Sequence, residues 1–167
     1  MRCMGQHQYK GGIILKAKEY LQQIRKLDKL IENKLIERQY WKNLACNITS
    51  SQNTENVQSS KNHDKMAAAV SKYVDIEREI DNCIDALYET KKDILNVIEQ
   101  LETTEYDILH KVYVQYIDLT DVAIKLDRSY TSVTSTHGRA LKNVQKILDE
   151  RSKRILAEQI HDELQLL

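Results

Sequence analysis

Residues 70–101, VSKYVDIEREIDNCIDALYETKKDILNVIEQL, carry the most regular hydrophobic pattern in this chain of 167 residues. Alternating steps of three and four residues reach ten positions, of which eight are apolar and two are charged. These positions are Val70, Tyr73, Glu77, Ile80, Ile84, Leu87, Lys91, Ile94, Ile98 and Leu101. Such spacing predicts a left-handed coiled-coil seam on a helix that begins near Asp64, which can cap it, and ends near Leu101.

Another amphipathic pattern precedes this seam. Apolar residues at helical spacing predict a long helix from about Ile13 to about Ala45. The intervening residues 47–63, NITSSQNTENVQSSKNH, are almost entirely polar, which predicts a flexible loop. The seam therefore has two candidate partners. The first helix can fold back as an antiparallel hairpin, which the long loop permits, or the same helix of a second subunit can pair with it in a homodimer.

The composition of the chain favours helices throughout. There is no Pro and no Phe, and there are only four Gly, so little interrupts a helix and little favours a sheet. The formal net charge is zero, but it is unevenly distributed: residues 128–154 contain seven basic and two acidic residues. We therefore expect an all-α protein with a local basic segment of the kind that contacts phosphates.

After the seam, the helical patterns become shorter. Apolar positions in residues 106–116, in residues 119–126 and from residue 129 onward predict three helices with short joints. This gives a flexible arm at 1–12, a coiled-coil-like helical hairpin at 13–102, and a three-helix domain with a C-terminal extension at 103–167.

The segment at 119–141, LTDVAIKLDRSYTSVTSTHGRAL, fits a helix-turn-helix. Ala123 supplies the small residue that lets two helices cross closely, and Val133 supplies the apolar anchor of the second helix. Between them, Asp127 occupies the turn position that Gly usually fills, and Asp tolerates a left-handed backbone. Ser129 can cap the second helix through its hydroxyl.

Helical spacing from these points assigns roles to the exposed side chains. Polar residues in the first turns of the second helix are expected to read base edges in the major groove, and flanking cations to meet phosphates. The base-reading candidates are Tyr130, Thr131, Thr134 and Ser135, and the phosphate-binding candidates are Arg128, Arg139, Lys142 and Lys146.

Residues 105–147 resemble region four of bacterial sigma factors, the domain that reads the minus-35 promoter element. The features that carry the likeness are Tyr113, the run TDVAIKL at 120–126, Ser129, and RALK at 139–142. The wider chain resembles small phage and prophage proteins of Gram-positive bacteria, in YLQQIRKLDKLIENKL at 20–35, VQS at 57–59, KM at 65–66, IEREIDNCIDAL at 76–87 and HGRAL at 137–141. The resemblance implies a sigma-like transcriptional regulator that binds double-stranded DNA, with RNA polymerase as a further partner.

Two other functions fit the sequence. A small-terminase-like DNA-packaging protein also joins a helix-turn-helix to oligomerising helices, although in those proteins the DNA-binding domain usually comes first. A helical protein-protein adaptor is the third hypothesis.

Nothing in the sequence indicates an enzyme, a cofactor or a metal site. There is no Gly-rich phosphate loop, and Glu158 with His161 is only half of a di-iron motif. The sequence lacks a signal-peptide pattern and any stretch of membrane-spanning length, so we expect a cytoplasmic protein without a membrane partner.

Overall fold

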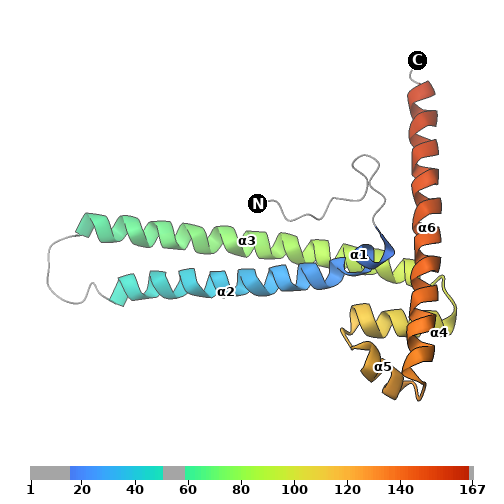
Figure 1. Ribbon diagram of the computed structural model, residues 1–167. Helices are drawn as coiled ribbons and strands as arrows, with labels where there is room; N and C mark the ends of the chain where they lie inside the picture. The colour runs from blue at the N-terminus through green and yellow to red at the C-terminus, as the bar shows by residue number, and fades with distance from the viewer. Residues whose placement is uncertain (1–15, 51–58, 166–167) are drawn as a thin grey trace. The chain divides into compact units, whose positions relative to one another are not determined.

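The protein is all-α across residues 16–50 and 59–165, the part that the computed structural model describes. Figure 1 shows the arrangement of its helices along the chain. They are α1 (Ala17–Leu21), α2 (Gln23–Ser50), α3 (Ser59–Ile98), α4 (Thr103–Leu109), the π-helix η2 (His110–Val114), α5 (Leu119–Lys125) and α6 (Tyr130–Gln165). The expectation of an all-helical protein from composition is confirmed for these residues.

The helix boundaries differ from the predicted ones. The first predicted helix is divided at Gln22, where α1 ends in a turn, and its expected start at Ile13 lies outside the described residues. The expected loop at 47–63 is shorter, because α2 continues to Ser50 and α3 already begins at Ser59. Ser, Asn and Thr have modest helix propensities, but without Gly or Pro they add to a helix at a cost of only ~0.5 kcal/mol each.

Helices α2 and α3 run antiparallel along the unit formed by residues 26–50 and 59–88 (Figure 1). An ion pair joins Lys34 to Glu79, and Arg38 Nη1 lies 3.8 Å from Glu77 Oε1. From the first pair to the second, the residue number rises along α2 and falls along α3, as antiparallel pairing requires. The Lys34 side chain is almost completely buried, and its hydrogen bond holds the pKa of Glu79 below its ordinary value.

The buried stripe of α3 coincides with the predicted seam at every second position and lies one residue before it at the others. Val70 and Ile84 are 45% and 48% exposed, whereas Ile76 and Cys83 are buried. The stripe of buried and half-buried residues steps by four and three through Ala69, Tyr73, Ile76, Ile80, Cys83, Leu87, Thr90, Ile94 and Val97. The two patterns share every second position, and the observed one replaces Glu77 and Lys91 with uncharged residues.

Residues 16–25 and 89–165 form a second compact unit. In it, α6 packs against α1, α4 and α5. A core cluster of Ile108, Val122, Ala123 and Val133 joins α4, α5 and the start of α6. The domain boundary expected at residue 102 differs from this grouping, because residues 89–98 of α3 belong to the second unit. Arg151 Nη1 of α6, for example, donates to Asp93 Oδ1 at 2.7 Å.

We expect Ile76→Ala to lower the free energy of unfolding by about 2–5 kcal/mol, because it leaves a cavity in the buried stripe. Ile84→Ala, its matched control on the exposed side of the same helix, should change this free energy by no more than about 0.5 kcal/mol. Urea denaturation followed by circular dichroism measures both. Equal losses for the two variants would contradict the observed stripe.

Candidate nucleic-acid interface

Helix α5 crosses the start of α6 over a fully apolar contact. Val122 and Val133 are completely buried, and Ala123 is 5% exposed. These three side chains pack with Ile108 of α4, and Leu126 lies partly buried against them. The small side chain of Ala123 permits the close crossing, as its place in the sequence predicted, and Val133 anchors α6 in the core.

A left-handed residue ends α5 and sets the direction of α6. Asp127 has φ 50°, and its N–H donates to the Ile124 carbonyl at 3.2 Å. The next N–H, that of Arg128, donates to the Ala123 carbonyl at 3.0 Å. This pair of bonds is a Schellman motif, which satisfies carbonyls that a helix end would otherwise leave unpaired. Asp127 therefore occupies the left-handed position after the helix, which is usually a glycine.

Ser129 caps α6 as the sequence predicted. Its hydroxyl oxygen accepts the N–H of Ser132 at 3.2 Å, and its carbonyl accepts the N–H of Val133 at 3.1 Å. The first bond satisfies one of the N–H groups that have no partner within a new helix. Val133 thus holds the first turns of α6 against the core, and Ser129 caps the N-terminus of the helix.

The four base-reading candidates all lie in the first turns of α6, but they differ in accessibility. Tyr130 is 53% exposed, and Thr131 and Ser135 are also exposed. Thr134 is only half-exposed, and its hydroxyl donates to its own helix, at the Tyr130 carbonyl 2.8 Å away. Thr131, Ser135 and Lys142 are exposed on one side of α6, and we call this row the outward ridge.

The phosphate-binding candidates separate into two groups. Arg128, Lys142 and Lys146 are exposed, and among the described residues none of them forms an ion pair. Arg139 is also exposed, with 59% of its side chain accessible, but its Nε donates to Glu105 Oε1 of α4 at 2.6 Å. Three cations therefore remain available on the outer surface.

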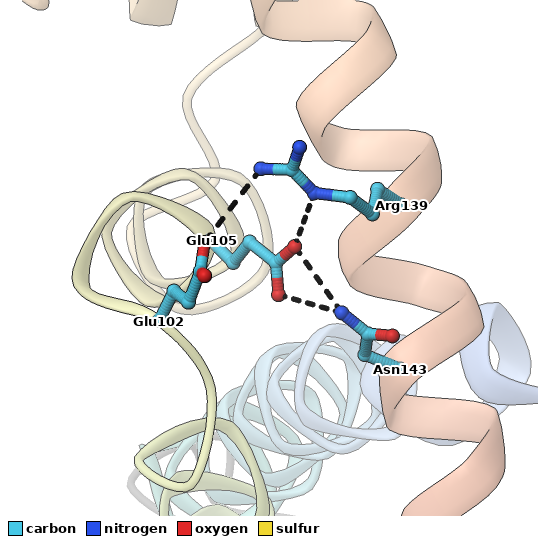
Figure 2. Close-up of polar contacts among 4 residues, drawn as sticks. All are labelled: Glu102, Glu105, Arg139 and Asn143. Atoms are coloured by element: carbon cyan, nitrogen blue, oxygen red, sulfur yellow. Dashed lines mark hydrogen bonds and ion pairs between the residues drawn. The ribbon is translucent and has the colours of Figure 1, made fainter.

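The partner of Arg139 is a buried carboxylate that sequence reasoning missed. Glu105 is 1% exposed, and Asn143 Nδ2 reaches both of its oxygens, at 3.0 and 3.2 Å (Figure 2). Arg139 Nη2 also lies 3.8 Å from Glu102, and the bond to Glu105 raises the pKa of Arg139. A signal was present in the sequence, because Glu105 shares the inward face of its helix with Ile108 and Leu109.

His137 of α6 packs against the π-helix. Its ring stacks on Tyr113 with centroids 5.8 Å apart, and its Nε2 lies 3.3 Å from the Tyr113 hydroxyl. Burial lowers the pKa of His137, and the positive charge of Lys18 adds to this effect. Burial also raises the pKa of Tyr113.

In the described part of the chain, no group of three His, Cys, Asp or Glu residues is placed to hold a metal ion. None of the described helices is both long enough and apolar enough to cross a membrane.

No family model, curated protein or solved structure matches this chain. Functional assignment therefore depends on the arrangement of its own side chains.

Arg139→Ala should lower the free energy of unfolding, because the buried Glu105 carboxylate would keep only the Asn143 amide as a partner. Lys142→Ala, one turn further along α6 on its exposed side, is the matched control and should change this free energy by less than about 0.5 kcal/mol. Thermal and urea denaturation measure the difference. An Arg139→Ala protein as stable as the parent would show that the ion pair contributes nothing to the fold.

Stability should also depend on pH through His137. Its pKa is lowered in the folded protein, so between that value and the ordinary 6.5 the unfolded chain binds more protons. The free energy of unfolding should therefore fall as the pH drops from about 7.5 to about 5, and His137→Gln should reduce this slope. Urea denaturation of both proteins across the pH series provides the test, and identical slopes would contradict it.

Proposed function

We propose that the protein is a sequence-specific regulator of transcription that binds duplex DNA with the first turns of α6. The observation that carries this proposal is the exposed, capped start of α6, seated on α5 by Ala123 and Val133 across a left-handed turn. A helix held in this way presents one full side to solvent. The major groove of B-DNA is about 12 Å wide and accepts such a helix.

The outward ridge of α6 supplies the contacts for base reading. Thr131, Ser135 and Lys142 lie on one side of the helix, opposite the buried Val133. Thr and Ser hydroxyls donate to or accept from any base edge, and the Thr methyl group contacts the thymine methyl group. Tyr130 adds a large exposed ring at the start of the helix.

The exposed cations supply the phosphate contacts in this proposal. Arg128 precedes α6, whereas Lys142 and Lys146 follow the base-reading turns, so they flank the segment that would enter the groove. Arg139 receives a different role from the one that sequence spacing gave it. Because its guanidinium is bonded to Glu105, we assign it to fixing α6 on α4 rather than to direct phosphate binding.

The remaining chain would connect this DNA-binding element to partners. We propose that residues 13–102 form a helical hairpin that precedes a sigma-like helix-turn-helix domain at 103–167, in a cytoplasmic regulator of phage or prophage genes. Exposed apolar side chains on α2 and α3 support a protein contact there, either with RNA polymerase or with a second copy. The most exposed are Ile36, Tyr40, Ile84 and Tyr88.

The same exposed side chains favour one alternative, a helical adaptor that binds only protein. The two hypotheses differ in their response to DNA. A regulator must bind duplex DNA at low salt, with an affinity that falls steeply as salt rises, because each neutralised phosphate releases counterions. An adaptor would show no such binding.

Base-reading and phosphate contacts can be separated by fluorescence anisotropy across a salt series, with a DNA duplex that has first been selected for binding to the protein. Lys142→Ala should weaken binding to all sequences alike and reduce the slope of log K against log salt by about 1. Thr131→Ala and Ser135→Ala should change which sequence is preferred, with about 1–3 kcal/mol less discrimination at the affected base pair.

Lys29→Ala, an exposed lysine on α2, is the matched control for lost charge and should leave the slope unchanged. Absence of binding at the lowest salt would overturn the proposal in favour of the adaptor. Equal effects of Thr131→Ala, Ser135→Ala and Lys142→Ala on every duplex would show that α6 does not read bases.

A further inference from the structure

A cavity of about 230 Å³ lies within the second unit, behind the start of α6. Its walls come from α1 and the beginning of α2, from η2 and the connection that follows it, and from α6. The Ala17 N–H, which donates to Gln145 Oε1 at 2.7 Å, ties α1 to α6 beside it. The cavity can hold one aromatic ring, since an apolar cavity of about 150 Å³ in another protein binds benzene.

Cations and aromatic rings line this cavity together. Lys18 and Arg25 reach it from the N-terminal helices, and Tyr113, Tyr116 and His137 form the facing wall. The Arg25 guanidinium carbon lies 5.6 Å from the centroid of the Tyr116 ring, within the range of a cation–π contact. Two exposed cations thus stand beside flat, partly apolar walls.

Among the described residues, Asp118 is the one carboxylate that lines the cavity. The charge there is therefore positive, with two cations against one anion. A ligand with one negative charge and a flat apolar body would pair with a cation while its ring packs against Tyr113 and His137. Val112 and Ile117 add further apolar surface to the same wall.

The backbone at the cavity is strained. Tyr116 has φ 58°, a conformation that a bulky side chain rarely adopts. It follows the π-helix, whose last bond runs from the Gln115 N–H to the His110 carbonyl at 3.1 Å. Such features cost about 1–3 kcal/mol and cluster where proteins bind ligands.

We propose that this cavity is a binding site for a small aromatic carboxylate. The ligand would contact His137 of α6 and Leu119 of α5, the two helices whose crossing presents the outward ridge. Occupation would therefore bias the position of α6 against α5 and change the affinity for DNA. This coupling rests on the proposed function, whereas binding of the ligand does not.

The test uses sodium benzoate and the full chain labelled with ¹³C-histidine, without DNA. Benzoate should produce a saturable shift of the His137 ring signals in ¹H–¹³C spectra and a rise in Tm. Lys18→Met and Arg25→Met should each weaken binding by about tenfold, since each removes one ion-pairing partner of the ligand. Lys29→Met, on α2 outside the cavity, is the matched control and should bind benzoate like the parent.

Benzamide, the neutral isostere, should bind about tenfold more weakly than benzoate, because it carries no charge to pair. The site is ruled out if benzoate gives no saturable shift, if benzamide binds as well, or if Lys18→Met and Arg25→Met have no effect. Anisotropy with DNA and benzoate then tests the coupling. Binding of benzoate by a chain that does not bind DNA would retain the site and reject only the proposed function.

Discussion

The position of α6 depends first on a buried negative charge. A carboxylate that is 1% exposed loses most of its hydration, and such a loss amounts to several kcal/mol unless hydrogen bonds replace it. Hydrogen bonds from Arg139 and Asn143, which lie one turn apart on α6, replace the lost hydration of Glu105. Because a misplaced helix would leave the charge without partners, this contact admits one register between α4 and α6. Apolar packing alone tolerates sliding more readily.

The turn at Asp127 adds the second constraint, which is one of direction. The Schellman bonds fix where α5 stops, and the cap at Ser129 fixes where α6 begins, so only about four residues change the course of the chain. The core of Ile108, Val122 and Val133 then closes over the crossing. Charge sets the register and the turn sets the angle, and together they decide which side of α6 faces solvent.

Local rules in the sequence were enough to predict much of this arrangement. The packing of Ala123, the turn at Asp127 and the cap at Ser129 each depend on one residue type at one place. In the structure Ala123 packs with Val133, Asp127 has a left-handed φ, and the Ser129 hydroxyl caps α6. The buried side of α3 was harder to predict. The predicted seam and the observed buried stripe share Tyr73, Ile80, Leu87 and Ile94, and they differ only at the positions between these residues. Periodicity alone does not choose between such stripes; the partner helix does. Arg139 was assigned by its charge, and only the fold reveals Glu105 beside it.

Gly138 makes a last connection between stability and the exposed side of α6. A glycine within a helix costs about 1 kcal/mol relative to alanine, and nothing lies within 4 Å of the place where its Cβ would stand. The fold therefore gives no packing reason for this glycine. It lies between Ser135 and Lys142 on the outward ridge, where a missing side chain lets another surface approach the helix backbone. The cost of this glycine therefore falls on the outward ridge, the side of α6 that the proposed function assigns to DNA.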